Sequence, residues 1–406
     1  MKEARAASYI KTGALAFAAT ILAFSLVLFP KEALEASGRG LDMWWNVVFP
    51  SLLPFFIVSE LLIGFGVVSF IGVILEPLMR PLFRVPGLGG FVWAMGLASG
   101  NPAGAKLAVQ MRQQKRITRI EGERLAGFTN SSNPLFIFGA IAVGFFFNPA
   151  LGMILALSHY AGNIMVGIVL RFYGKEDHQT KSLLRETKKT TLREAFHSLH
   201  QERLKDGRSI GKLLGDAVKS SIQTLLMIGG FIILFSVLNK LLTLIGVISL
   251  LAVLIGFLFG IFGLSPSLAE PFIAGLFEIT IGAQAISQTT DSTFLSQIVI
   301  VSFILGFGGL SIQAQVASIL ADSDIRFRPF FYARVLHGVF SACLAVIFYK
   351  LFYNPQSAAT IATVHPFPHP LIESWNLFQQ LAPLITFFAL ISYFILKCKS
   401  FKSEFS

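Results

Sequence analysis

Long apolar segments, separated by short polar loops, dominate the chain. An α-helix needs about 20 apolar residues to cross a bilayer, and period-two alternation typical of strands is absent. The pattern therefore predicts an all-α polytopic membrane protein with about 10–12 transmembrane or re-entrant helices. The predicted segments are 12–30, 44–66, 67–84, 89–108, 122–146, 149–172, 216–239, 242–263, 266–288, 294–318, 329–352 and 377–396.

The composition supports a membrane protein. Of the 406 residues, 54% are hydrophobic and only 14% are charged, whereas soluble domains carry about 25% charged residues. A soluble chain of this composition would lack the polar residues needed to cover its core. The chain has 33 Lys and Arg against 22 Asp and Glu, a net charge of +11. In a membrane protein such an excess is typical of cytoplasmic loops, so it does not indicate a nucleic-acid partner.

The positions of the basic residues predict the orientation. They gather in the loops 109–121, 173–215 and 319–328, with Arg334 close behind, and again in the C-terminal tail, while 353–376 contains no Lys or Arg. Twelve spans starting from a cytoplasmic N-terminus place all the basic loops inside, as the positive-inside rule requires. We therefore predict that both termini are cytoplasmic.

The chain also has the pattern of a duplication. Gly104-Ala105-Lys106 resembles Gly282-Ala283-Gln284, and each half contains five apolar segments. Five is odd, so the second repeat is inverted relative to the first, an arrangement typical of secondary transporters. The expected parts are an N-terminal helix and outer loop (1–43), a first repeat (44–172), a basic cytoplasmic linker (173–215), a second repeat (216–352), and an outer loop, closing helix and basic tail (353–406).

Four polar stretches interrupt the apolar segments, two in each half, at 99–106, 130–134, 278–284 and 306–315. Pro removes a backbone N–H and Gly loosens a helix, so these stretches predict short half-helices. The N-terminal N–H groups of such half-helices carry partial positive charge and suit an anion or a carbonyl. Matching interruptions in two halves point to a transport site. The alternative is that they are small-residue packing faces joined by polar side chains.

The polar side chains of these stretches are the candidate substrate-binding residues: Ser99, Asn101, Lys106, Asn130, Ser131, Ser132, Asn133, Glu278, Thr280, Ser311, Gln313 and Gln315. Lys106 either pairs with an anionic substrate or anchors the chain at the cytoplasmic face. Glu278 either serves the substrate or a coupling proton, or pairs with a basic residue of a neighbouring helix. His159 and His337 are interpreted as hydrogen-bonding residues between helices.

Motifs for other functions are missing from the sequence. There is no Gly-x-x-x-x-Gly-Lys-Ser/Thr motif of an ATP-driven pump, and neither His-Glu-x-x-His nor Gly-x-Ser-x-Gly occurs. The two cysteines, Cys343 and Cys398, form no metal-binding spacing. We therefore expect a protein that is not an enzyme and that has neither a cofactor nor a bound metal.

Three motifs of the first half carry a family resemblance: Gly40–Phe56, Ser99–Lys106 and Phe128–Ile137. On these motifs the chain resembles the YlbJ family of sporulation integral membrane proteins over about residues 40–350. The resemblance implies two nucleoside-recognition, or Gate, domains that correspond to the two repeats, with a distant similarity to concentrative nucleoside transporters. The chain departs from the family pattern at Asn101, where an aromatic or similar residue is expected before Pro102, and the effect of this departure on substrate choice stays open.

The resemblance implies a role in spore formation. Family members are held to move dipicolinate, a small aromatic dicarboxylate, from the mother cell across the outer forespore membrane. The resemblance thus implies a secondary transporter in the cell membrane, and in the outer forespore membrane during sporulation, that works by alternating access.

The expected partners are a small anionic substrate and the lipid bilayer. A homo-oligomer and a coupling proton or cation stay open. In this interpretation residues 130–133 and Lys106 bind the carboxylates, and Ser311, Gln313 and Gln315 form the matching wall. Two alternatives also stay open: a nucleoside-type transporter, and a sporulation membrane scaffold that transports nothing.

Overall fold

The computed structural model describes residues 2–174 and 191–353, and this part of the chain is helical throughout, without strands. The first half contains α1 (Lys2–Leu28), α2 (Pro30–Met43), the π-helix η1 (Trp44–Val48), α3 (Phe49–Gly64), α4 (Val67–Phe83), α5 (Leu88–Ser99), α6 (Ala103–Gln113), α7 (Arg119–Thr129), the π-helix η2 (Leu135–Phe145) and α8 (Pro149–Leu170). The second half contains α10 (Leu192–Asp206), α11 (Ile210–Leu244), α12 (Val247–Ile261), the 3-10 turn η3 (Pro266–Leu268), α13 (Ala269–Phe277), α14 (Ile279–Ser287), α15 (Phe294–Phe307), α16 (Gly309–Leu320) and α17 (Phe327–Phe352). The predicted closing helix at 377–396 lies outside the described residues.

Helices end at all four polar stretches, as predicted. The pairs α5/α6, α7/η2, α13/α14 and α15/α16 are each separated by one to five residues. Gly100 and Gly308 stand at two of these breaks with φ of +86° and +88°, a left-handed conformation that glycine adopts without a steric penalty. Each of the predicted segments 89–108, 122–146 and 266–288 is therefore two short helices.

Fewer unbroken spans result than the twelve segments predicted. Within the described residues, four helical stretches are long and apolar enough to cross a membrane: α8, α11, α15 together with α16, and α17. The bent pairs α1/α2 (103°) and α3/α4 (83°) raise the number to six if each pair is one span. A hydropathy window cannot detect such bends. The hydropathy pattern likewise gives no sign that residues 30–43, which it predicts as an outer loop, form the helix α2.

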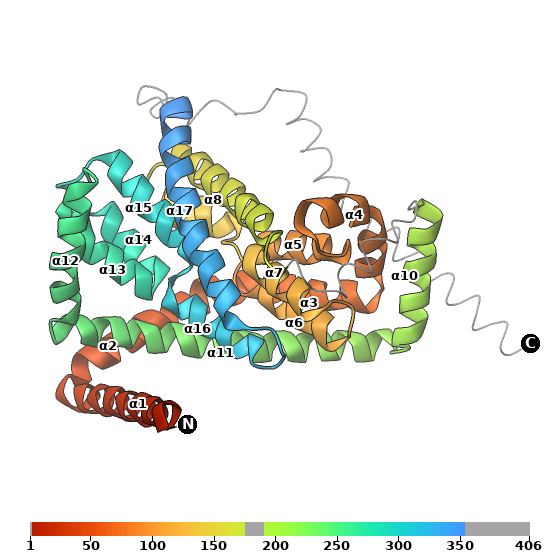
Figure 1. Ribbon diagram of the computed structural model, residues 1–406, viewed down its shortest axis with the longest axis horizontal. Helices are drawn as coiled ribbons and strands as arrows, with labels where there is room; N and C mark the ends of the chain where they lie inside the picture. The colour runs from red at the N-terminus through yellow and green to blue at the C-terminus, as the bar shows by residue number, and fades with distance from the viewer. Residues whose placement is uncertain (1, 175–190, 354–406) are drawn as a thin grey trace, which may run out of the picture. The chain divides into compact units, whose positions relative to one another are not determined.

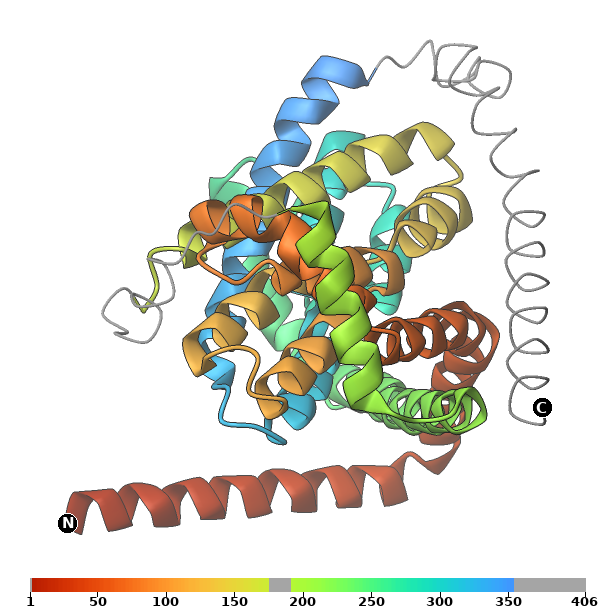
Figure 2. The same ribbon diagram turned by 90° about the vertical axis from the view of Figure 1, so that its right-hand side faces the viewer.

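Two hydrophobic cores are joined by α8 and α17, which pack side by side along their lengths (Figure 1 and Figure 2). The first core combines α4–α7 with α16, the end of α8 and the start of α17, and includes Phe83, Phe128, Leu170, Val316 and Phe330. The second combines α12–α15 with η2, the start of α8 and the end of α17, and includes Ile141, Leu155, Phe259, Ile304 and Ala345. Each core thus contains one half-helix from the other half of the sequence.

The 35-residue helix α11 runs along the other elements (Figure 1) and packs against α2, α3 and α16. At 1.5 Å per residue it is about 50 Å long. Trp44 fixes η1 to it, because the indole Nε1 donates to the carbonyl of Leu225 at 2.9 Å and the ring lies against Gly229. The helix thereby holds elements from both halves of the sequence in one unit.

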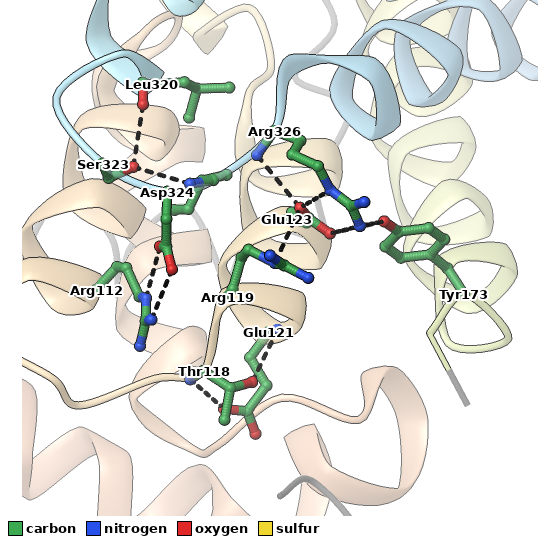
Figure 3. Close-up of polar contacts among 11 residues, drawn as sticks. Arg112, Thr118, Arg119, Glu121, Glu123, Tyr173, Leu320, Ser323, Asp324 and Arg326 are labelled. Carbon is green, nitrogen blue, oxygen red and sulfur yellow. Dashed lines mark hydrogen bonds and ion pairs between the residues drawn. The ribbon is translucent and has the colours of Figure 1, made fainter. Parts of the chain in front are cut away.

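Ion pairs join the α6–α7 region to the loop before α17 (Figure 3). Arg112 donates two hydrogen bonds of 2.8 Å to Asp324, which hold the pKa of that carboxyl below its ordinary value. The fully buried carboxylate of Glu123 accepts from Arg326 at 2.7 Å and from the hydroxyl of Tyr173 at 2.7 Å. Basic residues that predict the orientation therefore also connect the two halves.

These two contacts predict different losses of stability. Glu123→Gln should lower the free energy of unfolding by about 1–3 kcal/mol, because it weakens charged hydrogen bonds at a buried oxygen. Asp324→Asn should cost less than about 1 kcal/mol, because that pair is largely exposed to solvent. Thermal unfolding of the purified protein in detergent measures both changes. Equal losses of stability in the two variants would contradict the expectation that the buried contact contributes more than the exposed one.

Candidate functional site

A cavity of about 430 Å³ is lined by residues from all four polar stretches. Its volume lies within the range of small-molecule sites in proteins. Polar residues of the breaks line it together with apolar residues such as Phe136 of η2 and Ile228 and Ile232 of α11. The cavity therefore offers hydrogen-bonding groups beside an apolar surface, which suits a small aromatic molecule with polar substituents.

The structure brings eight of the twelve candidate residues to this cavity: Ser99, Asn101, Ser132, Asn133, Glu278, Thr280, Ser311 and Gln315. Lys106, Asn130, Ser131 and Gln313 do not line it. Asn46 of η1 does line it. The sequence analysis missed Asn46, although an amide inside an apolar segment is a signal for such a position.

Lys106 is engaged by groups from two other helices. Its Nζ lies 3.2 Å from the carboxylate of Glu60 in α3 and donates to the hydroxyl of Ser220 in α11 at 3.2 Å. The ammonium also lies over the ring of Phe56, at 5.1 Å from its centre. The ammonium charge of Lys106, which the sequence predicts to pair either with a substrate or with the cytoplasmic face, is therefore balanced by the carboxylate of Glu60.

Side-chain amides bond the free carbonyl groups where half-helices end. Asn133 donates to the carbonyl of Ser99, the last residue of α5, at 3.2 Å. Gln313 donates to the carbonyl of Phe307, the last residue of α15, at 3.0 Å. Asn130 likewise donates to a carbonyl in the last turn of α7 at 2.7 Å. The negative ends of three half-helices are thus satisfied by the protein itself.

The starts of the half-helices remain close to the cavity. Residues within about one turn of the starts of α6, η2, α14 and α16 line it, among them Asn101, Leu135, Ile279 and Ser311, and helix N-termini attract negative charge. One of them already holds a carboxylate: Glu278 caps α14 by accepting from the N–H of Ile281 at 3.0 Å and from the hydroxyl of Thr280. The arrangement therefore favours carboxylate groups at the helix starts.

A second cavity of about 880 Å³ adjoins the first. Arg39, Lys240, Asp42 and Glu270 line it. Glu278 and three neighbouring residues line both cavities. Glu278 consequently stands at the boundary between the inner cavity and a wider, charged one.

Arg334 is the residue whose position the sequence analysis misjudged most clearly. Instead of an orientation charge near a loop, it is a fully buried side chain of α17. Its guanidinium donates to the carbonyl of Asn130 and, at 2.9 Å, to that of Gly127. The signal was present in the sequence, because a charged residue inside an apolar segment is by default a functional candidate.

The histidine pair joins helices, as predicted. The backbone N–H of Ser132 donates to Nε2 of His159 at 2.9 Å. Nε2 of His337 lies 2.7 Å from the carbonyl of His159, and the two ring centres are 4.5 Å apart. Both side chains are buried, and together they connect α8, α17 and the first-half break.

The chain is similar to known proteins in sequence. Residues 45–162 and 225–323 match the Gate family model, described as nucleoside recognition. The sporulation integral membrane protein YlbJ of Bacillus subtilis (strain 168) is 51% identical over 394 residues, 96% of either chain. The chain belongs to the YlbJ family. No solved structure matches it.

The Gate regions of this YlbJ-family chain coincide with the site. All four helix breaks and all eight cavity-lining candidates lie within the matched residues 45–162 and 225–323. Arg334 and His337 lie beyond the second matched region. The family model therefore covers the walls of the cavity, whereas the side chains that support one wall from behind come partly from α17.

Proposed function

We propose that the chain is a secondary transporter that moves dipicolinate from the mother cell across the outer forespore membrane by alternating access. The observation that carries the proposal is the cavity lined by polar residues of four interrupted helices, at which side-chain amides bond the carbonyl groups of helix ends. Its relative YlbJ is named as a sporulation integral membrane protein, which supports a role in sporulation.

The chemistry of dipicolinate fits the lining. The molecule is a planar pyridine with two carboxylates, and carboxylates suit helix N-termini and side-chain amides. Ser132 and Asn133 supply polar groups from the first half of the chain, and Ser311 and Gln315 supply them from the second. The ring is expected to contact the apolar side chains of α11 and η2 beside them.

Transport rather than catalysis is the better proposal for such a lining. Its polar groups are mainly amides and hydroxyls, with Glu278 as its carboxylate. Amides and hydroxyls bind a solute without a reactive nucleophile and base. In this proposal both termini are cytoplasmic, the two Gate regions form inverted repeats, and exchange between the two orientations opens the cavity to either side.

A nucleoside-type transporter is the second candidate. The description of the Gate family model as nucleoside recognition favours it. The same amides and hydroxyls are able to bind a base and a sugar, which carry no charge. The charge of the substrate therefore separates the two candidates.

Uptake of labelled dipicolinate into proteoliposomes that contain the purified full-length protein tests the function, with uridine as a parallel substrate. We expect saturable uptake of dipicolinate, competed by the unlabelled compound, and no uptake of uridine. Uptake of uridine alone would move the chain to the nucleoside class. Uptake of neither substrate by protein with a cooperative unfolding transition would support the scaffold.

A matched pair of glutamines in α16 tests the site. Gln315 lines the cavity, and Gln313 caps a carbonyl outside it. Gln315→Ala should reduce the affinity for dipicolinate about tenfold or more, as expected for a lost hydrogen bond to a charged ligand, with little change in stability. Gln313→Ala should lower the thermal stability and leave the affinity of the folded protein unchanged. Titration calorimetry and thermal unfolding measure the two effects, and the reverse result would refute the assignment.

Glu278 is the proposed carrier of a coupling proton, because its carboxylate lies at the boundary of both cavities. Glu278→Gln keeps the size and an acceptor for the α14 cap but removes the ability to ionise. We expect the variant to lose stimulation of uptake by an imposed pH gradient. Glu270→Gln is the control, since Glu270 is an exposed carboxylate that lines only the wider cavity. If a pH gradient stimulates uptake by Glu278→Gln as much as uptake by the wild type, Glu278 does not carry the coupling proton.

A further inference from the structure

Arg334 is a buried cation without a carboxylate partner in the described part of the chain. None of the ion pairs found there includes it. Its guanidinium instead donates to two backbone carbonyls and lies near the ring of Phe330. Removing a charge from water without a counter-charge is costly. An arginine in such a place within a membrane protein therefore calls for a functional explanation.

The two carbonyls bonded by Arg334 belong to the end of α7. Gly127 lies in its last turn, and Asn130 is the first residue after it. Carbonyls at a helix C-terminus carry partial negative charge, and a cation there offsets it. Arg334 thus replaces a negative helix end with a net positive group at the first-half break.

This positive group stands directly behind the wall of the cavity. Ser132 and Asn133, which line the cavity, follow the bonded Asn130 by two and three residues. Two residues of extended chain span at most about 7 Å. Because Arg334 is fully buried, little water lies around it to screen its charge. Its field therefore reaches a solute in the cavity.

Other charges near the cavity do not give the same effect. Lys106 is balanced by Glu60 and does not line the cavity. Glu278 does line it and contributes a negative charge when ionised. Arg334 offsets that charge, and the cavity has a positive surplus whenever Glu278 holds a proton. A dianion that enters together with a proton on Glu278 would then leave a net charge of −1 at the site, instead of the −2 that results without the proton.

We propose that Arg334 gives the cavity its preference for an anionic over an uncharged substrate. It is a positioning residue: it acts through residues 127–133 and does not touch the substrate. The inference rests on the proposed transport function and names the group that sets the charge class of the substrate.

The experiment compares two ligands of one shape. Dipicolinate carries two negative charges at neutral pH, and pyridine-2,6-dicarboxamide carries none. Binding of both is measured by titration calorimetry on the full-length protein, as wild type, Arg334→Gln and Arg334→Lys. Arg334→Gln should weaken dipicolinate binding about tenfold or more relative to the diamide, the scale expected for a poorly screened charge some 10 Å away. Arg334→Lys keeps the charge and should retain most of the preference.

Arg124 supplies the matched control. It is also fully buried, and it also bonds backbone carbonyls, those of Arg84 and Tyr173, neither of which lines the cavity. Arg124→Gln should lower the thermal stability and leave the ratio of the two affinities unchanged.

The outcomes separate failure of this inference from failure of the function. Suppose that wild type prefers dipicolinate and that Arg334→Gln either retains that preference or loses affinity for both ligands equally. Arg334 is then only structural, and the inference is refuted while the proposed function is not. If wild type shows no preference for the dianion, including no binding at all, the inference and the proposed substrate fall together.

A second variant keeps the inference testable if Arg334→Gln does not fold. Asn163 is fully buried in α8, its amide has no partner among the described residues, and it lies one turn from His159. The His159 ring packs on His337, one turn from Arg334. Asn163→Asp introduces a carboxyl at constant size and leaves Arg334 in place. Because burial favours the uncharged form of a carboxyl, binding is measured over a pH series in which infrared spectroscopy follows its ionisation. Once the carboxyl is ionised, the preference for the dianion should fall, and an unchanged preference at that pH would overturn the inference.

Discussion

Every polar group of the backbone that lies inside a bilayer must be bonded by the protein, and this constraint shapes the whole molecule. A continuous helix meets it internally, but each of the four breaks releases carbonyls at one end and N–H groups at the other. The carbonyls are bonded by Asn133, Gln313, Asn130 and Arg334. Part of the N–H groups are bonded as well: Asn130 accepts from Ala105, Asn133 from Phe136 and Glu278 from Ile281. Asn130 and Asn133 therefore each bond the end of one half-helix and the start of another, which fixes how the breaks are placed around the cavity.

The long helices α8 and α17 make that arrangement rigid. They carry the histidine pair and Arg334, and they pass from one hydrophobic core into the other. The wall at residues 130–133 is therefore held from behind by groups that do not face the solute. Such a division separates the groups that support the wall from the groups that line the cavity.

The sequence predicted the breaks well and the charges poorly, for a physical reason. Pro102, Gly100 and Gly308 change local backbone preferences, and local effects are visible in a sequence. Whether a cation is balanced depends on distant neighbours. Glu60 balances the charge of Lys106 but lies 46 residues away in the sequence, and no local sequence pattern predicts that contact. Arg334 follows closely on a basic loop, so it was counted with that loop although its side chain turns into the interior.

The exchange of half-helices between the two cores makes each half of the chain depend on the other. The first core is completed by α16 from the second half, and the second core by η2 from the first. Either half expressed alone would expose an apolar surface where the exchanged helix now packs. Half-length expression of the chain would therefore separate helices that belong to the same core.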